Sequence, residues 1–395
     1  LEYFDGTTAL FIFRVDPEGI TMHYAPKSEG YQENLNRFLQ SIFNKPDRLS
    51  AAYQHFGVSA HQWYQTLVAP VIPDTTFPQM VLIAPDGLLS YLPFEVLLTQ
   101  APGNEQDFLN LPYLLQSSTC HYTYSAQLWL ENKRVTGLMK SASTVLGMAS
   151  DYSADQEFLP LPGASEEVVR LSTIYKDANL KVGSDASRSN FINLVEQQSW
   201  KTIHLAMHGV VDSLKDSKSR LAFTDKKHNN RNLYAYQIAG LDIQTPLVVL
   251  SACETGTGQL RRGEGVFSLA RSFMSAGVPS VVMSLWSTND QATKQIMGDF
   301  HQGLADGQSK AAALQSAKLA YLKNPADPIG HPAFWAPFVL IGDEVPLQRS
   351  GNRKFLIAAL VMVSFLFLFT MGMLMARISH LKAQKKASSP KGNEA

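Results

Sequence analysis

KTIHLAMHG, residues 201–209, and PLVVLSACETGTG, residues 246–258, are the most informative segments of the sequence. Each begins as a short apolar run that reads as a strand, and each ends in a residue that can do chemistry. His208 follows the first run, and Cys253 follows the second. Sites in parallel sheets form at the carboxyl ends of the strands. If the two strands are neighbours, the imidazole and the thiol project into one crevice.

Short apolar runs alternate with helical stretches on both sides of these two segments. The predicted strands are 144–148, 201–207, 247–252, 280–285 and 337–341. The predicted helices between them are 165–175, 189–198, 264–276, 290–304 and 309–322. This alternation predicts an α/β fold with a mainly parallel sheet that helices cover on both faces.

The first 140 residues predict a mixed α/β unit of their own. Residues 9–15 and 21–24 flank a Pro- and Gly-containing link, which is typical of a hairpin. Residues 29–42 and 51–68 have helical spacing, and 80–84 is a short strand. Because strand-forming sequence starts at the first residue, Leu1, we expect the chain to be a fragment of a longer polypeptide.

Composition narrows the possible functions. The 34 basic and 34 acidic residues give a formal net charge of zero, which argues against a general nucleic-acid binder. Cys120 and Cys253 are the two cysteines of the sequence, so a disulfide framework and a Cys-rich metal site are excluded. We therefore expect neither a metal nor another cofactor, and no nucleic-acid partner.

A cysteine and a histidine at strand ends can form a nucleophilic dyad. The thiolate is the reactive form of cysteine, and a nearby His208 would activate Cys253. The backbone N–H groups of Gly209 and Cys253 would stabilise the oxyanion formed on a peptide carbonyl. The alternative for a cysteine at a strand end is a small buried hydrophobe. Cys120 and His121 make a poor dyad, because adjacent strand residues point to opposite faces.

One segment predicts a membrane helix. Residues 355–376, FLIAALVMVSFLFLFTMGMLMA, contain no charge and are long enough to cross a bilayer. Residues 344–354 read as a juxtamembrane linker, and 377–395 as a basic tail. The tail is the more basic flank, so the positive-inside rule predicts a cytoplasmic tail and an extracytoplasmic catalytic domain. A buried core helix and the opposite orientation are the alternatives.

Five segments carry a family resemblance: 83–98 (IAPDGLLSYLPFEVLL), 203–209, 247–258, 263–290 and 331–343 (HPAFWAPFVLIGD). They resemble the CHAT family, caspase-like peptidases often found behind tetratricopeptide repeats. The resemblance implies a caspase–hemoglobinase-like fold, with 1–140 as a pseudo-peptidase-like half and 141–343 as the peptidase subdomain. It also implies His208 and Cys253 as the catalytic dyad, with Gly209 as an oxyanion donor.

The sequence thus predicts a membrane-anchored cysteine endopeptidase that cleaves proteins or peptides through a thioester. Upstream tetratricopeptide repeats, absent here, would regulate it. The first alternative is an inactive, membrane-tethered interaction scaffold, although a scaffold needs neither His208 nor Cys253. The second alternative is an acyl transferase that uses Cys253.

Four residues are candidates for substrate specificity. Caspase-like enzymes line the substrate groove with the loop that corresponds to Trp286–Asp290. Asp151, Glu254 or Asp290 would select a basic residue before the scissile bond. The alternative for Asp290 is a helix N-cap, and that for Glu254 is a structural hydrogen bond or salt bridge.

Overall fold

The computed structural model describes two compact units, Leu1–Gln348 and Arg349–Ala395. The described residues are 1–44, 49–72, 77–103, 107–139, 142–153, 155, 157–211, 218–224, 231–251, 265–286, 290–324, 330–347 and a few between 362 and 379. Most of the predicted membrane segment, 355–376, lies outside them. Among the residues that are described, no helix is both long and apolar enough to cross a membrane.

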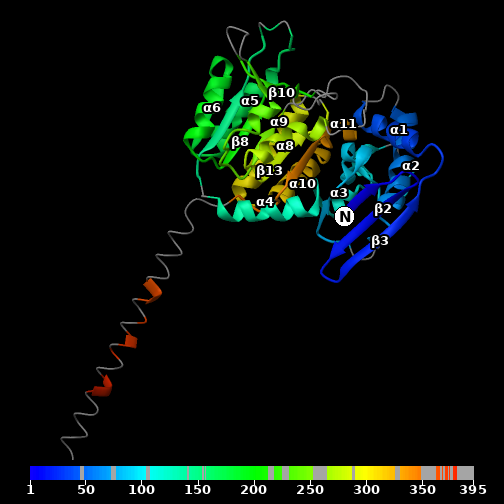
Figure 1. The fold of residues 1–395 in the computed structure, drawn as a ribbon, viewed down its shortest axis with the longest axis horizontal. Coiled ribbons are helices and arrows are strands. Elements are labelled where there is room, and N and C mark those ends of the chain that lie inside the picture. The colour runs from blue at the N-terminus through cyan, green and yellow to red at the C-terminus, as the bar shows by residue number, and fades with distance from the viewer. Residues whose placement is uncertain are drawn as a thin grey trace, which may run out of the picture. The chain divides into compact units, whose positions relative to one another are not determined.

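An eight-stranded sheet forms the centre of the first unit (Figure 1). Its strands, in spatial order, are β4 (Met80–Ile83), β5 (Thr119–Tyr122), β14 (Phe338–Gly342), β13 (Ser280–Ser284), β12 (Val248–Leu250), β8 (Thr202–Ala206), β6 (Val145–Ala149) and β7 (Ala178–Val182). Every neighbouring pair is parallel except β13 and β14. The predicted mainly parallel α/β sheet is therefore confirmed.

Helices cover this sheet where the apolar periodicity predicts them. Contacts place α5 (Pro162–Ile174), α9 (Asp290–Asp306) and α10 (Lys310–Leu322) side by side. The right-handed crossover rule puts α6 (Arg188–Gln197) and α8 (Gly265–Ser275) on the face opposite α5. Gly147 of β6 allows α5 to approach closely, because a Cβ there would lie 2.9 Å from the Leu171 side chain.

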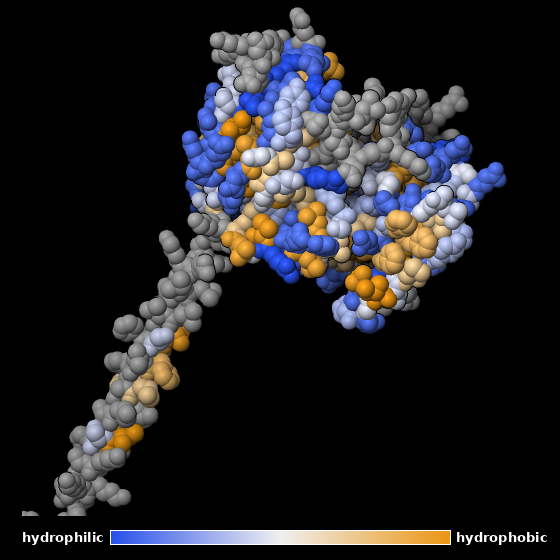
Figure 2. Space-filling model, in the orientation of Figure 1, coloured by the Kyte–Doolittle hydropathy of each residue, from blue (hydrophilic) through white to orange (hydrophobic). Residues whose placement is uncertain are grey.

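The predicted hairpin near the N-terminus is confirmed. The strands β1 (Glu2–Asp5), β2 (Ala9–Asp16) and β3 (Gly19–Pro26) form an antiparallel sheet. Asp16 accepts hydrogen bonds from the N–H groups of Glu18 and Gly19 at the turn. Figure 2 shows hydrophobic side chains gathered over this sheet. Ile20 of β3 is 72% exposed. The helices α1 (Tyr31–Phe43) and α2 (Leu49–Leu67) follow.

Several short elements had no clear signal in the sequence. A third sheet consists of the antiparallel strands β9 (Gly209–Val210), β10 (Arg220–Ala222) and β11 (Asn232–Tyr234). In Figure 1, β10 lies above β8 and β13. The remaining helices are α3 (Leu114–Ser117), α4 (Ala126–Leu138), α7 (Ala235–Ile238) and α11 (Pro332–Trp335), with 3₁₀ turns at Gly87–Tyr91, Phe94–Val96, Phe108–Asn110 and Gly183–Asp185.

Residues from the two predicted halves share one sheet and one core. The strand β5 pairs with β14, and one cluster of buried apolar side chains extends from Tyr3 to Leu347. Two buried ion pairs add to the contact between distant segments: Lys318 with Glu95, and Lys310 with Asp343 at 3.0 Å. The division near residue 140 stays a prediction, since it falls inside a single compact unit.

Candidate active site

The His208 strand and the strand before Cys253 are direct neighbours. β8 and β12 are parallel, with Ile203 opposite Val248 and Leu205 opposite Leu250. Just beyond β12, the N–H of Ser251 donates to the carbonyl of Leu205 at 3.0 Å. The sequence condition for a shared crevice, that these strands adjoin, is thus met. Cys253 and Glu254 themselves lie outside the described residues.

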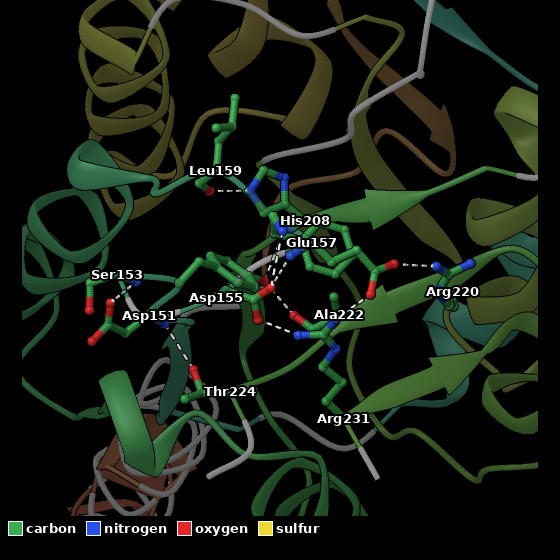
Figure 3. A network of polar contacts seen from close by, with 12 residues as sticks. Asp151, Ser153, Asp155, Glu157, Leu159, His208, Arg220, Ala222, Thr224 and Arg231 are labelled. Carbon is green, nitrogen blue, oxygen red and sulfur yellow. Dashed lines mark hydrogen bonds and ion pairs between the residues drawn. The ribbon is translucent and has the colours of Figure 1, made fainter. Parts of the chain in front are cut away.

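His208 has a buried and closely packed imidazole, with a residue exposure of only 1%. Its ring stacks on Phe158 at 5.0 Å between centroids and lies 4.6 Å from the Tyr152 ring. Its Nε2 lies 2.7 Å from the carbonyl oxygen of Leu159, as Figure 3 shows. A carbonyl can only accept, so Nε2 carries a proton and donates. In the neutral ring, Nδ1 then holds the lone pair that a general base needs.

The hydroxyl of Tyr152 bridges the backbones of His208 and Ala222. It accepts a hydrogen bond from the His208 N–H at 3.0 Å and donates to the carbonyl of Ala222. The Ala222 N–H donates to the His208 carbonyl at 2.9 Å. Burial raises the pKa of Tyr152 above its usual value, so the hydroxyl stays protonated and able to donate. A side chain from the loop after β6 thereby fixes the backbone of His208.

The N–H of Gly209 is not used in the pairing of β9 with β10. The Ala222 N–H donates to the His208 carbonyl, so these two residues form a hydrogen-bonded pair of the antiparallel ladder. The next pair, Gly209 and Leu221, therefore occupies a non-hydrogen-bonded position. The N–H of Gly209 therefore points away from β10. Its role as an oxyanion donor stays a prediction, because the nucleophile beside it is not described.

An ionic clamp holds the loop that covers His208. Arg231 pairs with both Asp155 and Glu157, and its guanidinium lies 5.0 Å from the Phe158 ring centre (Figure 3). Arg220 also reaches Glu157, at 2.9 Å. Desolvation acts to raise the pKa of Asp155. Hydrogen bonds from the N–H groups of Glu157 and Phe158, followed by the charge of Arg231, lower it below the usual value.

The described specificity candidates occupy three different environments. Asp151 is exposed just after β6, where its carboxylate accepts from the Ser153 N–H at 2.9 Å. Trp286 is buried after β13 and donates to the Ala333 carbonyl at 3.0 Å. Asp290 is the first residue of α9.

The carboxylate of Asp290 accepts from the Gly163 N–H of α5 at 3.4 Å, a contact between helix ends. The roles proposed for Asp151, Trp286 and Asp290 in specificity stay predictions. Among the described residues, no group of His, Cys, Asp and Glu side chains could hold a metal ion.

Cys120 lies in the interior of the other half of the sheet. Burial, and then the nearby charge of Glu95, raise the pKa of its thiol well above the usual value. A protonated, enclosed thiol is a poor nucleophile. This environment agrees with the sequence argument against Cys120 and His121 as a dyad.

Sequence reasoning missed the groups that position His208. His208 is in direct contact with Tyr152, Phe158 and Leu159, of which Leu159 is the nearest in sequence, 49 residues before it. Arg231 contacts the loop that carries these residues. Only weak signals exist for them, namely an aromatic residue just after a predicted strand and a charge cluster in the following loop. A carbonyl acceptor has no sequence signal, because every residue carries one.

The bridging role of the Tyr152 hydroxyl can be tested by Tyr152→Phe. The change leaves the His208 N–H and the Ala222 carbonyl without their buried partner, which costs about 1–3 kcal/mol of unfolding free energy. Urea denaturation measures the loss. Tyr113→Phe is the control, because the Tyr113 hydroxyl is buried with no hydrogen-bond partner among the described residues. Equal losses of unfolding free energy in the two variants would contradict the bridging role of the Tyr152 hydroxyl.

Three known proteins are similar to this chain in sequence or in structure. The human Tetratricopeptide repeat protein 28 is 26% identical over 332 residues, which cover 73% of this chain but only 13% of that protein. Gingipain R, the RgpB of Porphyromonas gingivalis, gives a TM-score of 0.46 at 12% identity, covering 82% of this chain and 77% of that one. The Saccharomyces cerevisiae separase–securin complex gives 0.43 at 10% identity, covering 82% and 20%.

The family itself rests on a sequence match, because both TM-scores are below 0.5. The description of the matching family is "CHAT domain", and the match extends over residues 58–343, which is most of the chain. That range contains the His208 strand and the segment with Cys253. The chain therefore belongs to the CHAT-domain family, as its motifs predicted.

Proposed function

We propose that this chain is a caspase-like cysteine endopeptidase with His208 as its base and Cys253 as its nucleophile. The observation that carries the proposal is the environment of His208. Its ring is buried just beyond the end of β8, the strand next to β12, with Nε2 bonded to the Leu159 carbonyl. This bond leaves Nδ1 as the basic nitrogen and stabilises the imidazolium once it forms, because the carbonyl dipole faces the positive ring.

In the proposed reaction, Nδ1 of His208 takes the thiol proton of Cys253, and sulfur attacks the carbonyl carbon of a peptide bond. The carbonyl oxygen becomes an oxyanion that accepts hydrogen bonds from the N–H groups of Gly209 and Cys253. The imidazolium gives its proton to the amide nitrogen, the C–N bond breaks, and the amine leaves. Water, activated by His208, then hydrolyses the thioester and restores the thiol.

The dyad predicts unequal effects of three single changes. Cys253→Ala abolishes cleavage, and His208→Ala lowers it by at least about a thousandfold, because members of a dyad act as a unit. Cys120→Ala leaves activity unchanged. Profiling the cleavage products of a proteome digested with each variant makes the comparison.

Three outcomes would contradict the proposed endopeptidase. Loss of cleavage in folded Cys120→Ala would show that Cys120, and not Cys253, is the thiol that cleavage requires. A wild-type profile that matches Cys253→Ala would favour the inactive scaffold, and transfer of an acyl group without hydrolysis would favour an acyl transferase.

We propose Asp151 as the first candidate for selecting a basic substrate residue, with Glu254 and Asp290 behind it. Asp151 is exposed at the carboxyl end of β6, next to the strand of His208. Asp151→Asn is expected to lower kcat/KM for an Arg peptide about tenfold more than for a Met peptide, because a charge-assisted hydrogen bond is lost. Asp177→Asn is the control, because Asp177 is exposed just before β7, at the opposite edge of the sheet. Equal losses on Arg, Met and Asp peptides would assign Asp151 a structural role.

We also propose that residues 355–376 anchor the chain in a membrane, on the strength of their uncharged sequence. The full chain should need detergent for extraction, whereas a chain truncated after Gly351 should be released as a folded unit. Recovery of the full chain in the soluble fraction without detergent would refute the anchor. A cysteine introduced at Ser388, with an impermeant thiol label, decides between the two orientations.

Tetratricopeptide repeats are the regulatory partner that we propose, because the human relative is named for them. Such repeats would act on the active site from outside the domain described here. Comparing cleavage by the domain alone with cleavage by a repeat-containing full-length protein tests this point. Identical rates under all conditions would argue against regulation by repeats.

A further inference from the structure

A chain of buried polar groups crosses beneath the two strands that lead to the proposed dyad. It runs from Ser251 to Glu167, His204, His301 and finally Tyr175, and none of these residues is more than 6% exposed. Ser251 follows β12, His204 lies in β8, Glu167 belongs to α5, and His301 belongs to α9. The mechanism proposed above uses none of them.

Glu167 is the centre of this chain, because one carboxylate oxygen contacts two neighbouring strands. Its Oε1 accepts a hydrogen bond from the hydroxyl of Ser251 and lies 2.8 Å from Nε2 of His204, without a hydrogen bond between these two atoms. Ser251 stands two residues before Cys253, and His204 four residues before His208. Glu167 thus connects the strand ends that carry the two proposed catalytic groups.

The rest of the chain holds His204 in place from the other side. Its Nδ1 lies 3.0 Å from Nε2 of His301, and Nδ1 of His301 lies 3.2 Å from the hydroxyl of Tyr175. Burial, with His204 second, lowers the pKa of His301 well below its usual value, so His301 is neutral. Burial raises the pKa of Tyr175, which keeps its hydroxyl protonated.

One arrangement of protons serves every member of the chain. The Ser251 hydroxyl donates to Glu167, while His301 donates from Nε2 to Nδ1 of His204. The Tyr175 hydroxyl completes the series at His301. A buried carboxylate is costly unless such partners surround it, so these positions are strongly specified relative to one another.

We propose that Glu167 is a positioning residue that fixes the ends of β8 and β12 in the geometry the His208–Cys253 pair requires. The inference rests on the proposed function. A purely structural role would predict that all members of the chain matter alike. A positioning role predicts that the Ser251 end, which lies in the same strand end as Cys253, matters most to the chemistry.

The test compares two losses of one hydroxyl, Ser251→Ala and Tyr175→Phe, in the full chain carrying Cys120→Ala. Cys253 is then the only thiol, and iodoacetamide alkylation reports its reactivity without a known substrate. The readout is the ratio of the rate constants at about pH 6 and about pH 10, because only an imidazolium-paired thiolate reacts at the lower pH. Circular dichroism at both pH values first selects folded variants, because an unfolded chain has an ordinary thiol and would also lower this ratio.

We expect Ser251→Ala to lower the ratio about fivefold or more, because a small displacement separates the paired groups. Tyr175→Phe should leave the ratio within about twofold, although it also removes a buried hydrogen bond. Ser251→Thr keeps the hydroxyl and should restore the ratio. Glu167→Gln, nearly isosteric, should lower it and serves as a second variant if Ser251→Ala does not fold.

Different results would overturn the inference and the proposed function. A wild-type ratio in folded Ser251→Ala, with a low ratio in His208→Ala, refutes the positioning role and leaves the dyad standing. Equal falls in Ser251→Ala and Tyr175→Phe also refute it, in favour of general structural support. A ratio that His208→Ala does not change refutes the dyad itself, and the positioning role with it.

Discussion

The parallel pairing of β8 with β12 is the constraint on which the candidate site depends. Because Leu205 lies opposite Leu250, the chain leaves both strands at the same edge of the sheet. His208 then comes three residues after its paired residue, and Cys253 three residues after its own. A shift of one residue in this register would turn every side chain of one strand to the other face. The register of the two strands is therefore set by backbone hydrogen bonds inside the sheet.

Side-chain contacts on both faces of the sheet stabilise the register of these strands. Above the edge, the Tyr152 hydroxyl bridges the backbone of His208 and Ala222, and the Arg231 clamp holds the covering loop. Beneath the sheet, Glu167 contacts both Ser251 and His204. A tautomer with the proton on Nε2 is consistent with the general base role that we propose for His208.

The sequence predicted the main sheet well, because its signals are local. Runs of apolar residues, separated by helical periodicity, gave the strands β6, β8, β12 and β13 within a few residues. The antiparallel pairing of β14 with β13 could not be read from such a run, since direction depends on the path of the chain. The short sheet β9–β11 was missed because strands of two or three residues have no periodicity.

The candidate site was predicted in part for the same reason. A histidine at the end of a strand is visible in the sequence, and the family motif added its role. The contacts of Glu167 with Ser251, 84 residues apart, and of Tyr152 with His208 depend on the three-dimensional path alone. Single buried polar residues such as Glu167 are the part that a sequence could flag. A glutamate on an apolar helix face needs a partner inside the protein.

A structure of the protein after reaction with a peptidyl chloromethyl ketone is the sharpest test of the His208–Cys253 dyad. We expect a thioether on Sγ of Cys253, with the His208 ring on the same side of the sheet. We also expect that the ketone oxygen lies within hydrogen-bond distance, about 2.7–3.1 Å, of the Gly209 N–H. An adduct on Cys253 that faces away from His208, across the sheet, would contradict the dyad.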